Sequence, residues 1–117
     1  MRFMILIQSD ESQWARMSDE EKKPVYHAHF RFAKELRAAG AFVAGDSLRP
    51  SARGARISVR DGRRSIVDGP FTETKELVGG YYVLEARSRE EAVEWAARCP
   101  AALFGTVELR ELEELPV

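Results

Sequence analysis

The sequence predicts an α+β fold in which two helices are set among strands, with a β-hairpin in the middle of the chain. Three observations support this prediction. Apolar runs of strand length lie near both ends of the chain, two helix-capping patterns precede amphipathic segments, and Asp61-Gly62 separates two short segments rich in β-branched residues. At 117 residues the chain has the usual size of one domain, so we expect a single domain over residues 1–117.

The first strand is expected at residues 2–8, RFMILIQ, where apolar side chains follow one another without polar alternation, and both of its faces should therefore be buried. The spacing of Ser18 and Glu21 is that of a capping box, which predicts a helix running towards Gly40. Pro24 lies late for a first-turn proline. An initial turn separate from the main helix is therefore expected.

The remaining elements follow from glycine, proline and capping signals. Asp61-Gly62 tolerates positive φ angles and suits the tight turn of a hairpin, and Gly45 marks an irregularity in the second strand. A second capping box at Ser88 and Glu91 opens a helix that is expected to stop at Pro100. The strands that follow the first are expected at residues 41–48, 56–60, 64–67, 79–86 and 104–112.

This order of elements is a ferredoxin-like βαββαβ plan with an additional hairpin. Two helices can cover only one face of such a sheet. The other face would carry side chains from residues 3–7 and 81–84, and an apolar sheet face left in water indicates association. We therefore expect a homodimer in which two sheets cover each other. Because Tyr81 and Tyr82 alternate across their strand, one should face the helices and the other the dimer interior.

Composition limits the classes of function. Lys and Arg number 18 against 19 Asp and Glu, a balance that gives no long-range positive field, so no direct nucleic-acid partner is expected. With one cysteine, Cys99, and two histidines, neither a disulfide nor a metal site is expected, and no cofactor motif is present. The apolar run at residues 3–7 is too short for a signal peptide or a membrane span, which favours a cytoplasmic protein without a membrane partner.

Residues 68–76 read DGPFTETKE, a motif that resembles the signature of the DGPF-domain branch of the YCII-related family. The resemblance extends over the AHFRFAKELRAAG helix, the Glu-Trp-Ala-Ala segment at 94–97 and the closing strand at Val107-Glu108. It implies a dimeric α+β barrel and a cleft in which a histidine and an aspartate suggest an enzyme. Since some members lie beside or are fused to sigma factors, it also implies an alternative function as a regulatory or interaction module in transcription.

His29 is the first candidate for a catalytic residue. It matches the family's helix position and lies on the same helical stripe as Phe32 and Leu36, whereas His27 points elsewhere. An imidazole held against a sheet can titrate near neutral pH and serve as an acid or base if a carboxylate orients it. The alternative is a histidine at the edge of the core, hydrogen-bonded to a carbonyl or to a tyrosine hydroxyl.

Asp68 is the candidate partner of His29, and its alternative role is that of a turn former before Gly-Pro that accepts backbone hydrogen bonds. In the related branch without this loop, the suspected aspartate lies near the end of the second helix, where this chain has residues 97–100, Ala-Arg-Cys-Pro. Asp46 is a further candidate. For Cys99 a buried structural role is favoured over that of a nucleophile.

Together these residues predict a small-molecule-binding protein, with cofactor-free lyase or isomerase chemistry as its simplest reaction. The cleft would lie between the first helix and the sheet, closed by the loop at 68–78, with His29 moving a proton and Asp68 orienting it. The sequence does not identify the ligand. For Phe71 the alternative is a structural role as a side chain packed in the core. Glu73 and Lys75 have the alternative of a weak surface ion pair. The residues expected to bind the ligand are Phe71, Glu73, Lys75 and Tyr81.

Overall fold

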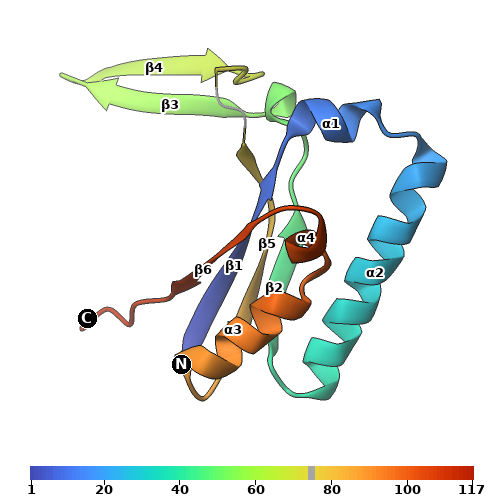
Figure 1. The fold of residues 1–117 in the computed structure, drawn as a ribbon. Coiled ribbons are helices and arrows are strands. Elements are labelled where there is room, and N and C mark those ends of the chain that lie inside the picture. Colours follow the sequence, from blue (N-terminus) through green and yellow to red (C-terminus); the bar gives the residue numbers. More distant parts are fainter. Residues whose placement is uncertain (74–75) are drawn as a thin grey trace.

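A computed structural model describes residues 1–73 and 76–117, so Lys75, one of the predicted ligand-binding residues, lies outside the described part. Four strands form an antiparallel sheet in the order β2-β5-β1-β6 (Figure 1). They are β1 (Arg2–Ser9), β2 (Phe42–Ser47), β5 (Leu77–Glu85) and β6 (Val107–Glu111). The predicted mixed α+β fold is confirmed.

Two longer helices, α2 (Asp19–Ala38) and α3 (Arg89–Arg98), pack on one face of this sheet. Their buried side chains form a single cluster with apolar residues of β1 and β5, which also includes Cys99. The amphipathic spacing of α2 places Phe32 and Leu36 in this core, as predicted. The members with 3% exposure or less are Phe3, Ile5, Phe32, Leu36, Leu84, Ala92 and Cys99.

The register of the sheet separates the two tyrosines of β5. Tyr82 lies opposite Ile5 on the helix-facing side, whereas Tyr81 lies opposite Leu6 on the other side. The shift of register in β2 falls between Phe42 and Ala44, so the irregularity expected at Gly45 was wrongly placed.

The helix α2 is continuous, and the separate initial turn expected before Pro24 is wrong. The capping box is present, since the Ser18 hydroxyl accepts from the Glu21 N–H at 3.1 Å and the Glu21 carboxylate accepts from the Ser18 N–H at 2.9 Å. Pro24 lies at the sixth helical position and removes one intrahelical bond, towards Glu20. The cap and the long buried face downstream outweigh that loss.

Two short helices were not predicted. Asp10 caps α1 (Glu11–Arg16) by accepting hydrogen bonds from the N–H groups of Ser12 and Gln13. Pro100 not only ends α3 but is also the first residue of α4 (Pro100–Phe104), a position where its missing N–H has no cost. Phe104, expected in the last strand, therefore ends a helix, and β6 starts three residues later.

The second capping box is only half formed. The Ser88 hydroxyl accepts from the Glu91 N–H at 3.1 Å, but the Glu91 carboxylate accepts from Nε of Arg87 at 3.0 Å and does not reach back to Ser88. The prediction of a reciprocal box was wrong here because a neighbouring guanidinium offers the carboxylate a charged donor. One cap bond is still enough to start α3 at Arg89.

The predicted hairpin is confirmed and forms a two-stranded sheet of its own. It consists of β3 (Ala55–Arg60) and β4 (Arg63–Asp68), preceded by the short helix η1 (Ser51–Arg53). Asp61 and Gly62 both have positive φ, 52° and 74°, as a type I′ turn requires. Figure 1 shows the hairpin projecting away from the main sheet.

The projecting hairpin makes the chain extended. Its radius of gyration is 16.3 Å, whereas a compact domain of this length has about 13 Å. Among the helices of the described residues, none combines the length and the apolar character needed to cross a bilayer.

Candidate functional site

A histidine–tyrosine pair lies between α2 and the sheet. Nδ1 of His29 is 2.7 Å from the Tyr82 hydroxyl oxygen, and the two rings lie nearly parallel with centroids 5.9 Å apart. Phe32, three residues along α2, packs edge-on against the Tyr82 ring at 5.1 Å. The inward stripe of α2 therefore brings both His29 and Phe32 to the same tyrosine.

Gly45 of β2 makes room for the Tyr82 ring. The two residues lie opposite each other in the sheet, and a Cβ at Gly45 would come within 2.9 Å of Cδ1 of Tyr82. A side chain there would push the ring and change its distance from His29. The absence of a side chain at Gly45 thus positions the histidine–tyrosine pair.

Burial keeps both members of the pair neutral. It lowers the pKa of His29 below its usual 6.5, because a half-buried imidazolium loses hydration. It raises the pKa of Tyr82 well above 10, with the nearby Cys99 thiol adding to the effect. In the described part of the chain no protein group is hydrogen-bonded to Nε2 of His29, so this nitrogen is available to a ligand.

Asp68 does not join this pair in the structure. It is the last residue of β4, is exposed, and lies opposite Ala55 in the hairpin. Within the described residues, no hydrogen bond or ion pair connects it to His29. The predicted partnership of His29 and Asp68 stays a prediction, and Asp46, exposed on β2 opposite Tyr81, lies on the face of the sheet away from His29.

The residues after Asp68 form a close junction with η1. The Gly69 N–H donates to the Gly54 carbonyl at 3.0 Å, and Gly69 approaches Ser51 so closely that a Cβ would lie 1.8 Å from the Ser51 carbonyl oxygen. The Phe71 N–H donates to Oγ of Ser51 at 3.1 Å. The Glu11 carboxylate in turn accepts from the Ser51 N–H at 2.6 Å and from its hydroxyl at 2.7 Å.

Phe71 lies in this junction and not in the core, so the prediction that it plugs the core is wrong. The Arg56 guanidinium lies 3.9 Å over its ring and also pairs with Glu73. A hydrogen bond from the backbone and the contact with Arg56 lower the pKa of the exposed Glu73. The aromatic ring is thus covered by an arginine of the hairpin, which replaces burial under the helices.

Two of the predicted ligand-binding residues, Tyr81 and Glu73, do not lie beside His29. Tyr81 is half-buried on the face away from α2, and Glu73 is engaged with Arg56. The structure therefore brings His29 to Tyr82, which was not among the predicted site residues. The strict alternation along β5 had left open which tyrosine would face the helices.

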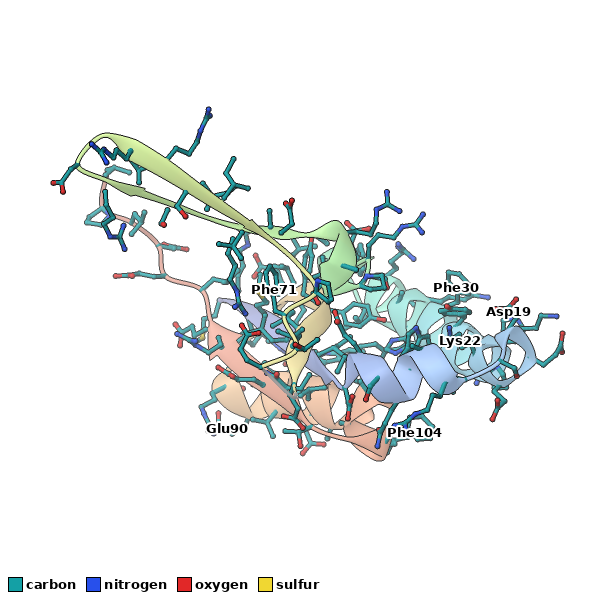
Figure 2. All side chains as sticks on the ribbon, turned by 90° about the horizontal axis from the view of Figure 1, so that it is seen from above. Asp19, Lys22, Phe30, Phe71, Glu90 and Phe104 are labelled. Atoms are coloured by element: carbon teal, nitrogen blue, oxygen red, sulfur yellow. The ribbon has the colours of Figure 1, made fainter. Side chains whose placement is uncertain are left out.

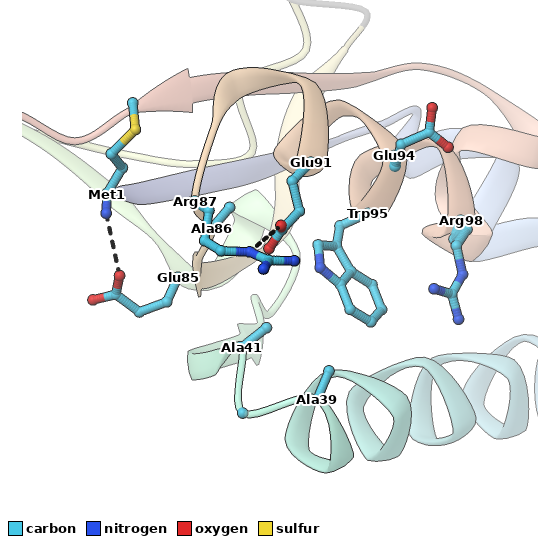
Figure 3. A pocket seen from close by; sticks show the side chains of 11 residues that line it. Met1, Ala39, Ala41, Glu85, Ala86, Arg87, Glu91, Glu94, Trp95 and Arg98 are labelled. Atoms are coloured by element: carbon cyan, nitrogen blue, oxygen red, sulfur yellow. Dashed lines mark hydrogen bonds and ion pairs between the residues drawn. The ribbon is translucent and has the colours of Figure 1, made fainter.

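A hollow lies elsewhere, between the C-terminal end of α2 and α3 (Figure 3). It is an open depression of about 790 Å³ with Trp95 on its wall. Arg98 stacks on Trp95 at 4.5 Å and pairs with Glu35. Arg87 pairs with Glu91 on the same rim, and none of the predicted site residues that the structure describes lines the hollow. Arg87, Glu91 and Arg98 are thus engaged with protein partners, whereas Glu94 on the same wall makes no ion pair with a described residue.

These features define a small α+β domain with a neutral histidine–tyrosine pair between a helix and an antiparallel sheet. The YCII-related domain matches residues 1–116, and the chain belongs to the YCII-related family. An uncharacterised protein of Rhizobium meliloti (strain 1021) is 30% identical over 96 residues, which is 82% of this chain and 77% of that protein. The assignment to the DGPF branch stays a prediction.

The fold is similar to that of a solved enzyme. The 5-chloro-2-hydroxyhydroquinone dehydrochlorinase of Burkholderia phenoliruptrix AC1100, solved in complex with 2,5-dihydroxybenzoquinone, superposes with a TM-score of 0.52. The match covers 97% of this chain and 94% of that one, at 20% sequence identity. At this identity the likeness concerns the fold.

Proposed function

We propose that this protein binds a small molecule at His29 and moves a proton on it without a cofactor, as a lyase or isomerase does. The observation that carries the proposal is the hydrogen bond between Nδ1 of His29 and the Tyr82 hydroxyl. It fixes the orientation of the imidazole while Nε2 faces no protein partner in the described residues. A fixed, neutral imidazole with one available nitrogen is the arrangement that a general base needs.

The proposed step needs no oxidant or reductant. With Nδ1–H donating to the Tyr82 oxygen, the lone pair on Nε2 of His29 takes a proton from the ligand, and the bonding electrons form a new double bond. In an isomerase the resulting imidazolium returns the proton to another ligand atom. In a lyase the electron pair expels a leaving group. The lowered pKa of His29 keeps the base form populated at neutral pH.

A hydroxylated quinone or phenol is the ligand class we propose. The structurally similar dehydrochlorinase is solved with 2,5-dihydroxybenzoquinone, and dehydrochlorination is itself a lyase-type reaction. Phe32 is buried in the core and packs edge-on against Tyr82, so it holds in place the tyrosine that orients His29. Asp68 and the loop after it are proposed to close over the ligand, with Asp68 as a second acid–base group.

The homodimer is part of the same proposal. The sheet face away from α2 and α3 carries Met4, Leu6, Tyr81 and Val83, and Val83 is buried without belonging to the main core. We call this surface the open face. Pairing of two open faces would give the dimeric α+β barrel and would remove the partly exposed Met4, Leu6 and Tyr81 from water.

Binding of 2,5-dihydroxybenzoquinone, followed by NMR on the full chain, tests the proposal. We expect the largest shift changes at His29 and Tyr82, and a loss of affinity of at least tenfold in His29→Gln and Tyr82→Phe. His27→Gln removes the other histidine, which is exposed on the same helix, and is the matched control. Asp68→Asn tests the second acid–base group separately, because no hydrogen bond or ion pair among the described residues joins Asp68 to His29.

Two results would contradict the proposal. One is binding of the quinone that is equally strong in wild type and His29→Gln. The other is shift changes confined to the hollow at Trp95, which would place the ligand between α2 and α3. Thermal unfolding of each variant shows whether a loss of binding reflects a loss of the fold.

A further inference from the structure

The hairpin of β3 and β4, which we call the arm (residues 55–68), has an uncovered aliphatic face. Ile57 and Ile66 lie opposite each other, and Val59 follows on the same face, with exposed fractions of 65%, 56% and 57%. A two-stranded hairpin without a covering layer is at best marginally stable. We therefore expect the aliphatic face of the arm to pack on another protein surface.

The arm and its base are also strongly basic, although the whole chain is nearly neutral. Between residues 49 and 68 there are six arginines against Asp61 and Asp68. Arg56 is engaged with Phe71 and Glu73. Arg63 and Arg64, at the turn, make no ion pair within the described residues. A partner for this surface should therefore be acidic as well as apolar.

A segment of this chain has that complementary character. Residues 108–114, which we call the acidic segment, contain four glutamates and one arginine, and Leu115 after it is 67% exposed. The segment starts in β6, an edge strand with a neighbour on one side only, and continues beyond the sheet. Glu113 and Glu114 make no ion pair with any other described residue.

The two surfaces leave the main sheet at opposite ends. The arm is connected at the end where Ser9 pairs with Leu77, and the acidic segment leaves at the end where Phe3 pairs with Glu111. Six residues of β1 separate these points, or about 20 Å. Both project to the side away from α2 (Figures 1 and 2). If the sheet of a second copy runs antiparallel to the sheet of the first, this arrangement places the arm of one copy beside the acidic segment of the other.

We propose that the arm of one copy packs on the acidic segment of a second copy, and that a twofold axis forms this contact twice. Arg64, which lies opposite Val59 on the aliphatic face, meets Glu113 and Glu114, while that face covers apolar side chains next to them. Arg63 lies opposite Arg60 on the other face of the arm and adds to its positive charge. The opposite charges select the partner, and the aliphatic surface supplies the burial. The contact does not depend on the proton transfer proposed for His29.

Reversal of charge on either surface, measured by sedimentation velocity, tests this assembly. The first variant is Arg63→Glu/Arg64→Glu and the second is Glu113→Arg/Glu114→Arg, each compared with wild type over a range of concentrations. Each should weaken self-association at least tenfold, because two like-charged contacts form in each homodimer. Arg31→Glu/Lys34→Glu, with the same change of charge on exposed α2 positions, should associate like wild type.

The mixture of the two variants gives the decisive result. Within a heterodimer both contacts again join opposite charges, so the mixture should associate at least tenfold more tightly than either variant alone. Raised salt should weaken this association. Pairing through the open faces alone would instead leave wild type, both variants and their mixture equally associated. Failure of the mixture to associate overturns the proposal, as does a wild-type chain that is monomeric at all concentrations. Binding of a DNA duplex through Arg63 and Arg64, with self-association unchanged, would show a nucleic-acid surface and overturn it too.

Discussion

The Glu11 carboxylate accepts two hydrogen bonds from Ser51, at 2.6 Å from its N–H and at 2.7 Å from its hydroxyl. Since the Ser51 hydroxyl oxygen also accepts from the Phe71 N–H, one glutamate connects α1, η1 and the start of the segment after β4. The junction is half-buried, which makes its hydrogen bonds stronger than those of an exposed ion pair.

Replacement of Glu11 by alanine should lower the free energy of unfolding by about 1–3 kcal/mol, because two donors of Ser51 lose a charged acceptor. Chemical denaturation measures the loss, and faster hydrogen exchange at the Ser51 amide localises it. Glu20→Ala removes an exposed carboxylate paired with Lys23 and should change stability by less than about 0.5 kcal/mol. Equal effects of the two substitutions would show that the junction contributes nothing special.

Gly69→Ala should be far more damaging than Gly54→Ala. At Gly69 the new Cβ would lie 1.8 Å from the Ser51 carbonyl oxygen, so the backbone at the base of the arm has to move. At Gly54 the nearest atom to a new Cβ is the same oxygen at 3.4 Å, an ordinary contact. We expect a lowered melting temperature and altered amide shifts around Ser51 for Gly69→Ala alone. Equally mild effects would mean that the DGPF motif is not constrained by packing at its glycine.

Removal of the Tyr82 hydroxyl should cost stability even without a ligand. Tyr82→Phe leaves Nδ1 of the half-buried His29 without its partner, at an expected cost of about 1 kcal/mol in the free energy of unfolding. Tyr81→Phe, one residue earlier but on the open face, is the matched control and should cost less. A larger loss for Tyr81→Phe would indicate that the open face, not the His29 pair, holds the more important hydroxyl.

The regular elements of the fold could be predicted from the sequence because each carries a local signal. The capping box at Ser18 and Glu21, the apolar stripe through Phe32 and the turn at Asp61-Gly62 all act over fewer than about eight residues. The helix α1 was not predicted because its six residues are too few to show a periodic apolar face.

The site was less predictable because its contacts join distant parts of the chain. Ser51 lies 40 residues from Glu11, and His29 lies 53 residues from Tyr82. Period-two alternation showed that one tyrosine of the pair faces the helices, but the face depends on the register of β5 against β1. That register is set by packing of the whole sheet, so the sequence left Tyr81 and Tyr82 as alternatives.

Cys99 should be inert towards thiol reagents while the chain is folded. Its side chain is fully buried in the core, and burial raises the pKa of the thiol, so little thiolate is present at neutral pH. Since it is the single cysteine, reaction with Ellman's reagent reports on this residue alone. We expect reaction at the rate of unfolding, and full reaction in denaturant. Rapid stoichiometric labelling of the native chain would restore the nucleophile as a candidate.

The lowered pKa of His29 predicts a specific loss of stability in acid. An unfolded imidazole binds a proton as the pH falls through 6.5, whereas the folded one resists protonation until a lower pH because burial excludes water from the ion. Between these two pH values the unfolded chain holds more protons than the folded chain. The stability that neutral His29 contributes is therefore complete above pH 6.5 and is lost as the pH falls towards the folded pKa. Melting temperatures at about pH 7.5 and about pH 5.5 should therefore differ more for wild type and His27→Gln than for His29→Gln. An equal acid dependence in all three chains would show that His29 titrates like an exposed residue, and the neutral base proposed for catalysis would lose its physical reason.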